Sequence, residues 1–166
     1  MQRYDKKDIA KHQLKTAVTL FLNNKNDSSV ITLAGAAANI LHQLVLNAGR
    51  EPFIDYACKV HNDLKGNTPS RKKYLHFADE LLGITDNKHM SDTDQDVIQI
   101  DLKECAINTI TRAICDYTSL YGQDENFVQA YLKWSSKNSR PAVMAACKNM
   151  HEKYKKMIEK KSEKRI

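Results

Sequence analysis

The sequence predicts an all-α protein, a single bundle of six or seven helices, and three observations lead to this prediction. Apolar residues recur every three or four positions along most of the chain, the spacing of one face of a helix. Glycine and proline are scarce, with 5 and 3 among 166 residues, whereas sandwiches and barrels need many turns built from them. A chain of this length buries roughly 70% of its unfolded surface, so it can form its own core.

The first two predicted helices span 7–23 and 29–47. The first has an apolar face made of Ile9, Leu14, Ala17, Val18 and Phe21. The second is apolar on nearly every side, as a central helix is. Asp27 or Ser28 is expected to cap it by accepting a bond from its free N–H groups.

Small residues fill the middle of the second helix, from Leu33 to Ala38. Among them is Gly35, and glycine costs about 1 kcal/mol in a helix interior. We therefore expect another backbone to pass very close to it. That backbone belongs either to the same subunit or to a second copy across a dimer interface.

Three further helices are predicted at 51–64, 71–82 and 97–120. Pro52 suits a first helical turn, where its missing N–H costs nothing. Residues 83–96, between the helices predicted at 71–82 and 97–120, have short, polar side chains that favour turns, and they predict a loop. A loop of that length is unusual in a compact domain unless it is functional or disordered.

The last part of the chain holds one apolar helix and one charged helix. Asp124 and Glu125 favour a helix start after Gly122, because acids suit the positive end of the helix dipole. A final helix is expected from Ala142, and beyond Met150 charged residues dominate it, so we expect it to fray.

Positive charge is concentrated at the C-terminus. The formal net charge is +6, and residues 148–166 supply +5 of it. We therefore divide the single domain into a nearly neutral bundle, 1–147, and a basic helix or tail, 148–166. The tail is either a solvated helix end or a non-specific contact for the phosphates of RNA. The residues expected to make that contact are Lys153, Lys155, Lys156, Lys160 and Lys161.

Cysteine spacing and hydropathy indicate a cytoplasmic protein that does not enter a membrane. The four cysteines form no Cys-x-x-Cys pair, and reduced thiols are typical of the cytoplasm. The N-terminus lacks the apolar core of a signal peptide. The most apolar stretch, Val30–Leu46, is short and interrupted by polar residues, which favours a buried helix over a membrane span.

Three segments resemble an uncharacterised bacterial all-helical family associated with HEPN-type nucleotide-binding and ribonuclease bundles. They are Ile31–Leu41, Lys73–Asp79 and Ile114–Gly122. The resemblance is spread over residues 17–134 and rests mostly on core-like positions. It implies a HEPN-like helical bundle.

The same resemblance implies a catalytic pair, since HEPN ribonucleases share an Arg-x4–6-His motif and Arg71 and His76 match it. Histidine can move the proton of an attacking 2′-hydroxyl, and arginine can hold the phosphate. Five residues of helix place the two on different faces. The alternative for His76 is a partly buried side chain bonded to Asp79.

Polar residues within apolar helices are the other candidates for a site. Asn39 and His42, together with Asp79, form either an internal hydrogen-bond cluster or a ligand pocket. Arg112 and Asp116, four residues apart, are expected to form an ion pair that could otherwise hold a ligand phosphate. The paired Glu-x-x-His motifs of metal-carboxylate bundles do not occur in the sequence, so we expect neither a metal nor another cofactor.

These features favour a bacterial helical binding or interaction module that associates with itself, with RNA or with a protein partner. Two alternatives stay open. One is a metal-independent HEPN-type ribonuclease that uses Arg71 and His76. The other is a nucleotide-binding or small-molecule-binding bundle around Asn39 and His42.

Overall fold

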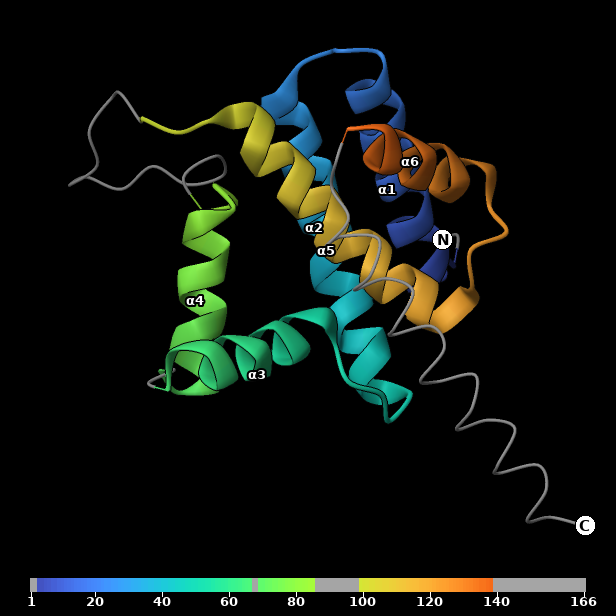
Figure 1. Cartoon of the computed structure of the whole chain (residues 1–166). Helices are drawn as coiled ribbons and strands as arrows, with labels where there is room; N and C mark the ends of the chain where they lie inside the picture. Colours follow the sequence, from blue (N-terminus) through green and yellow to red (C-terminus); the bar gives the residue numbers. More distant parts are fainter. Residues whose placement is uncertain (1–2, 67–68, 86–98, 139–166) are drawn as a thin grey trace, which may run out of the picture.

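A computed structural model describes residues 3–66, 69–85 and 99–138, and this part of the chain is helical without any strand. The predicted all-α class is therefore confirmed, with helices packed side by side as a bundle (Figure 1). The helices are α1 Lys6–Leu22, α2 Asp27–Asn47, α3 Phe53–Lys65, α4 Arg71–Leu81, α5 Leu102–Tyr121 and α6 Asn126–Lys137. Most of the predicted 83–96 loop, the final helix and the basic tail lie outside the described residues.

Capping side chains and extended residues move several helix starts from their predicted positions. Asn26, and not Asp27 or Ser28, caps α2, with its side chain accepting the N–H of Ser29 at 2.9 Å. Asp101 caps α5, so this helix begins at Leu102 and not at 97. Before α3 and α6 the cap residue is extended, so each helix begins two residues later than predicted.

The most enclosed helix is α5, although the sequence predicted α2 to be central. Every residue from Cys105 to Ser119 except Asn108 is buried in α5, whereas α2 keeps an exposed face that includes Thr32 and Gln43. The polar residues of α5 tolerate burial because their hydroxyls bond the backbone of the preceding turn. Thr109 and Thr111, for example, each donate to the carbonyl four residues earlier at 2.8 Å.

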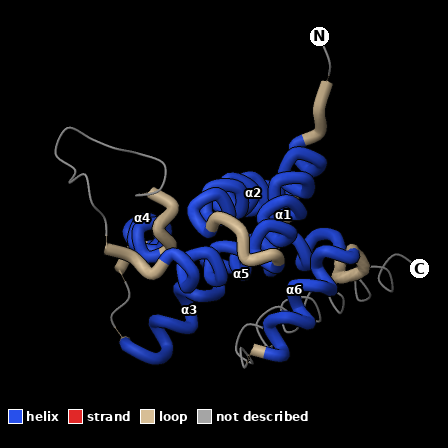
Figure 2. The backbone as a smooth tube through the Cα atoms, turned by 90° about the horizontal axis from the view of Figure 1, so that it is seen from above, coloured by secondary structure: helices blue, strands red, loops and turns tan. Residues whose placement is uncertain are grey.

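α2 packs against α5 on one side and α1 on the other, and α6 covers α1 (Figure 2). Aromatic rings make the contact with α6, where Phe21 meets Trp134 edge-on at 4.6 Å between ring centroids. By length and composition α2 could cross a membrane. In this bundle its apolar residues form the core with α1 and α5.

Gly35 in α2 is approached by a side chain and not by a backbone, so the predicted backbone contact is wrong. A Cβ atom there would lie 3.2 Å from Cγ2 of Ile84, which is buried in the turn after α4. Ala34, Ala37 and Ala38 are also fully buried within the subunit. The buried residues of this segment therefore pack within the subunit, with Ile84 after α4 lying against Gly35.

Replacing Gly35 with valine is expected to destabilise the fold by about 1–3 kcal/mol, the usual cost of overpacking. Urea unfolding would measure it, with Lys15→Val at an exposed position of α1 as the control for β-branching. Adding Ile84→Ala to Gly35→Val should recover part of the loss. A double variant with simply additive losses would contradict this contact as the cause.

α3 and α4 form a separate pair beside the bundle (Figure 1). The pair is attached to α5 at both of its ends. The N–H of Phe53 at the start of α3 donates to Asp116 of α5 at 2.7 Å. At the end of α4, the hydroxyl oxygen of Thr109 of α5 lies 3.4 Å from the carbonyl of Leu82, next to the buried Ile84. Charged side chains lie between these two attachments.

Candidate functional site

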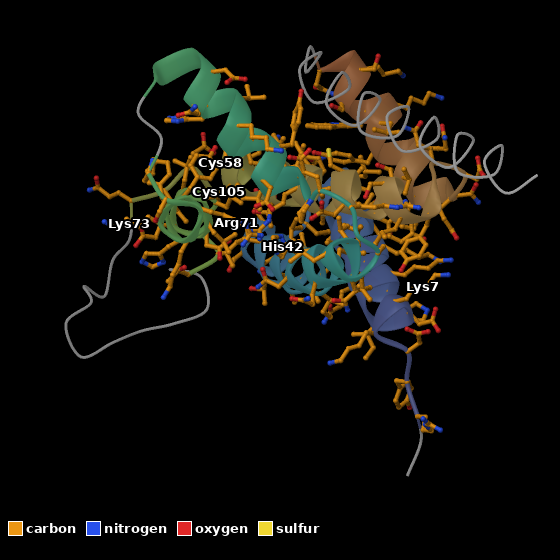
Figure 3. All side chains as sticks on the ribbon, turned by 90° about the horizontal axis from the view of Figure 1, so that it is seen from below. Lys7, His42, Cys58, Arg71, Lys73 and Cys105 are labelled. Atoms are coloured by element: carbon orange, nitrogen blue, oxygen red, sulfur yellow. The ribbon has the colours of Figure 1, made fainter. Side chains whose placement is uncertain are left out.

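A group of polar and charged side chains lies where the α3–α4 pair meets α2 and α5. We call it the charged cluster. Two of its members, His42 and Arg71, come from different helices and lie close together in Figure 3. The cluster consists of Asn39 and His42 of α2, Asp55 of α3, Arg71 and Asp79 of α4, and Arg112 and Asp116 of α5.

Arg112 is the most deeply buried cation of the cluster, with 2% of its surface exposed. Its Nη1 forms an ion pair with Asp79, and its Nη2 lies 3.5 Å from the side-chain oxygen of Asn39. Its Nε has no hydrogen-bond partner in the described part of the chain. A buried donor without a partner is costly, and Arg112 is therefore held through its two Nη atoms.

The predicted Arg112–Asp116 ion pair does not form, because each residue has another partner. Arg112 pairs with Asp79, and one oxygen of Asp116 accepts the N–H of Phe53, at the positive end of α3. The Asp116 side chain is fully buried. Its other oxygen has no partner among residues 3–66, 69–85 and 99–138.

Burial raises the pKa of Asp116 to about 7. The N–H of Phe53 and the charge of Arg112 both act to lower this pKa, and Asp55 acts to raise it, but desolvation outweighs them. Near neutral pH this carboxyl group therefore exchanges between a form that donates a hydrogen bond and a form that only accepts one.

His42 is half-buried, and its Nε2 lies 3.5 Å from Nη2 of Arg71. Burial, followed by the charge of Arg112, lowers its pKa; Arg71 acts in the same direction, while Asp55 and Asp79 oppose it. The imidazole is therefore neutral at pH 7 and can accept or donate a proton. Its buried Nδ1 has no hydrogen-bond partner within the described ranges.

Arg71 is held in place by two parallel bonds to Asp55, from Nε at 2.8 Å and from Nη2 at 3.0 Å. These bonds raise the pKa of Arg71. A bidentate pair fixes the plane of the guanidinium group. Its Nη1 takes no part in these two bonds, and half of the side chain is exposed, so Arg71 is both oriented and accessible.

Arg71 and His76 do not meet in the structure. His76 is 70% exposed and contacts Glu80, with 3.2 Å between Nε2 and Oε1. The predicted bond from His76 to Asp79 is wrong. His76 contacts Glu80, four residues later, and Asp79 pairs with Arg112 instead. The histidine beside Arg71 is His42.

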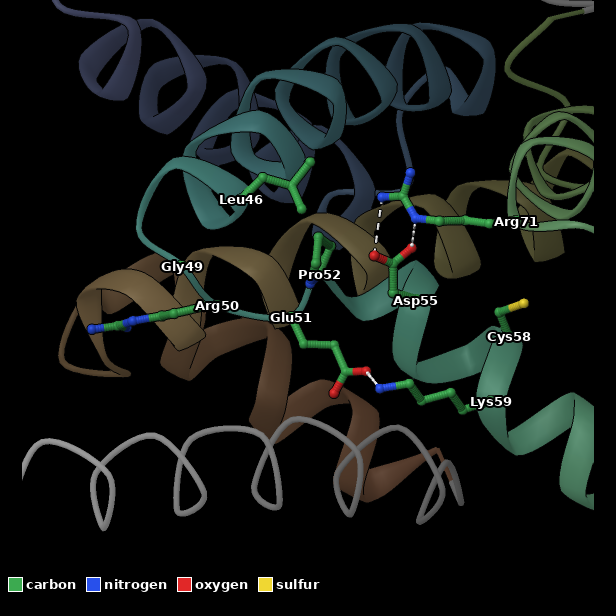
Figure 4. A pocket seen from close by; sticks show the side chains of 9 residues that line it. All are labelled: Leu46, Gly49, Arg50, Glu51, Pro52, Asp55, Cys58, Lys59 and Arg71. Atoms are coloured by element: carbon green, nitrogen blue, oxygen red, sulfur yellow. Dashed lines mark hydrogen bonds and ion pairs between the residues drawn. The ribbon is translucent and has the colours of Figure 1, made fainter. Parts of the chain in front are cut away.

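A pocket of about 500 Å³ adjoins the charged cluster (Figure 4). Asp55 and Arg71 belong to both, so their ion pair forms the boundary between the open pocket and the buried cluster. Volumes of this size suit small organic ligands. The lining residues are Leu46, Gly49, Arg50, Glu51, Pro52, Asp55, Cys58, Lys59 and Arg71.

The pocket wall combines apolar surface with charged groups that are already oriented. Lys59 forms an ion pair with Glu51, and Nη1 of Arg50 donates to the carbonyl of Ser119. Three cations against two carboxylates leave a small positive excess in the wall. The pocket therefore suits a molecule with an apolar part and an anionic group.

Two site predictions remain, the absence of a metal site and the contact of the tail with RNA. No group of three or more His, Cys, Asp or Glu residues that could hold a metal ion occurs in the part of the chain that the structure describes. The lysines predicted to contact nucleic acid, Lys153, Lys155, Lys156, Lys160 and Lys161, lie outside it.

The fold and the site together define an all-α helical bundle with a charged cluster beside an open pocket. Comparison with known proteins finds no matching family model, no similar curated protein and no similar solved structure. The resemblance to HEPN-type bundles is left untested by these comparisons.

Proposed function

We propose that the protein is a helical binding module that takes a small anionic molecule into the pocket beside the charged cluster. The observation that carries the proposal is the position of Arg71. Its guanidinium is fixed by Asp55, reaches His42 and forms part of the pocket wall. An arginine that is oriented before the ligand arrives loses little entropy on binding.

The expected ligand has two parts. An anionic group would contact Nη1 of Arg71 and the positive excess of the wall. The rest of the ligand, uncharged and with apolar faces, would lie against the apolar part of the wall, which includes Leu46 and Pro52. A nucleoside monophosphate has both parts and a size that suits the pocket.

Binding should appear as thermal stabilisation, because a ligand that binds only the folded state raises the melting temperature by mass action. We expect AMP to stabilise the full-length protein more than adenosine does. At about 100 times the dissociation constant the gain is about 2.7 kcal/mol, which is several degrees for a chain of this size. Pyrophosphate should give an intermediate effect.

Arg71→Gln should abolish the difference between AMP and adenosine. Lys72→Gln is the matched control, since it removes the same charge one residue away, at an exposed position outside the pocket. If Lys72→Gln lost as much of the AMP–adenosine difference as Arg71→Gln does, the effect would be general charge attraction and not a specific contact with Arg71. No stabilisation of the wild type by AMP or pyrophosphate would contradict the proposed ligand class.

A second candidate function is metal-independent cleavage of RNA, favoured by the 3.5 Å approach of Arg71 to His42. His42 would act as the proton acceptor and Arg71 would hold the phosphate. When the variants are incubated with a labelled oligoribonucleotide and a chelator, cleavage should be lost in His42→Ala and retained in His76→Ala. The reverse pattern would favour the Arg71–His76 pair predicted from the sequence.

A further inference from the structure

α4 has two faces of different character. Its inner face holds Arg71, Ala78 and Asp79, which contact the rest of the molecule. On the opposite side Phe77 is 51% exposed and Leu81 is 65% exposed, although both are large and apolar. Spacings of three and four residues place them on one surface. We call it the outer face of α4, made of Lys73, His76, Phe77, Glu80 and Leu81.

The charged residues of α4 are placed unfavourably with respect to the dipole of the helix. The helix begins with three cations, Arg71, Lys72 and Lys73, and it has no acidic residue in the first turn. Asp79 and Glu80 lie near its end, and no basic residue lies in the last turn. Cations are favourable at the C-terminal end of a helix and acids at the N-terminal end. The arrangement therefore costs stability in an isolated α4.

We propose that a second copy of this chain docks on the outer face, with the two α4 helices antiparallel across a two-fold axis near Phe77. This arrangement places Lys73 opposite Glu80 of the partner subunit, and Glu80 opposite the partner subunit's Lys73. Each cationic start then lies beside an acidic end, which offsets the unfavourable dipole interactions. Phe77 is covered at the centre of the contact, and Leu81, near its edge, packs on the aliphatic stem of the partner subunit's Lys73.

A two-fold axis makes an interface self-complementary, as the charge order of α4 requires. Parallel helices would place Lys73 opposite Lys73 instead. An RNA partner would meet the cations but also Glu80, and it would leave Leu81 without an apolar contact. The 11 residues of α4 span about 16 Å, so the interface is small. We expect a concentration-dependent dimer and not a permanent one.

Sedimentation velocity of the full-length protein between 1 and 500 µM is the test. The wild type should shift from monomer to dimer across this range. Phe77→Gln with Leu81→Gln should stay monomeric, with circular dichroism to confirm folding. Lys15→Gln on α1 is the control for a surface change elsewhere. A wild type that stays monomeric, or a double variant that still dimerises, would overturn the proposal.

Charge reversal tests the antiparallel register separately. Lys73→Glu alone and Glu80→Lys alone should each be monomeric, because like charges then face each other twice. An equimolar mixture of these two variants should form a heterodimer, since each contact again joins opposite charges. This rescue distinguishes the interface from misfolding. No rescue on mixing, or dimers of either single variant that match the wild type, would exclude this register.

Discussion

Replacing Arg112 with alanine is expected to lower the free energy of unfolding by about 3–5 kcal/mol, the cost of removing one partner from a buried ion pair. Arg112 is 2% exposed and joins α5 to Asp79 of α4 and Asn39 of α2. Its loss is expected to leave a cavity and to remove a cation that favours the charged form of Asp116. Chemical denaturation at pH 7 would measure the change.

Two further variants separate the causes of this loss. Arg112→Met restores most of the volume without the charge, so it should cost less than alanine. Arg71→Ala removes the cation of the more exposed pair with Asp55, and solvent screening should hold that cost to about 1 kcal/mol or less. Equal costs for Arg112→Ala and Arg71→Ala would show that burial of Arg112 contributes nothing.

Asp116→Asn is expected to remove a pH dependence of stability. The pKa of Asp116 is about 7 in the folded protein and 3.8 ordinarily. Between these values the folded state binds a proton that the unfolded state has released. Wild-type stability should therefore fall as the pH rises from about 4 to about 7, by an amount on the order of 4 kcal/mol.

Asparagine keeps an oxygen that can accept the N–H of Phe53, but it carries no charge. We expect the variant to lack this slope and to be at least as stable as the wild type at pH 8. His42 contributes in the opposite sense, since its pKa is lowered and stability is lost as the pH falls below 6.5. The difference between wild type and variant isolates Asp116.

Thermal melts between pH 4 and pH 8 would give this difference, with Asp124→Asn at an exposed position as the control. A constant difference across the range would contradict the raised pKa of Asp116. A variant that is less stable than the wild type at pH 8 would show that the carboxylate contributes more than its burial costs.

Periodicity predicted the helices because each amphipathic face repeats along a single segment. It did not predict which helix is most enclosed. The buried part of α5 contains threonines, a serine and two charged residues, Arg112 and Asp116, and it therefore looks half exposed in the sequence. Those hydroxyls bond the helix's own backbone. A buried polar residue of this kind gives no hydrophobic signal, so the central position of α5 follows only from packing.

The candidate site was predicted in part. The sequence indicated Asn39, His42, Asp79, Arg71 and Arg112 in three separate groups, and the structure brings them together. Asp55 was missed, because an acid in the first turn of a helix is common for reasons of the dipole alone. Which partners Arg71 and Asp79 take depends on how α4 docks against α2, α3 and α5, and no spacing along one helix specifies that arrangement.

The enclosure of α5 has a consequence for how the protein opens. Because every residue from Cys105 to Ser119 except Asn108 is buried, we expect the amides of this segment to reach solvent only when the whole bundle unfolds. The α3–α4 pair has few contacts with the bundle beyond its two ends, where Asp116 accepts the N–H of Phe53, Arg112 pairs with Asp79 and Ile84 is buried. This pair therefore forms the least protected cooperative unit of the described chain, and it can separate while α1, α2 and α5 stay folded.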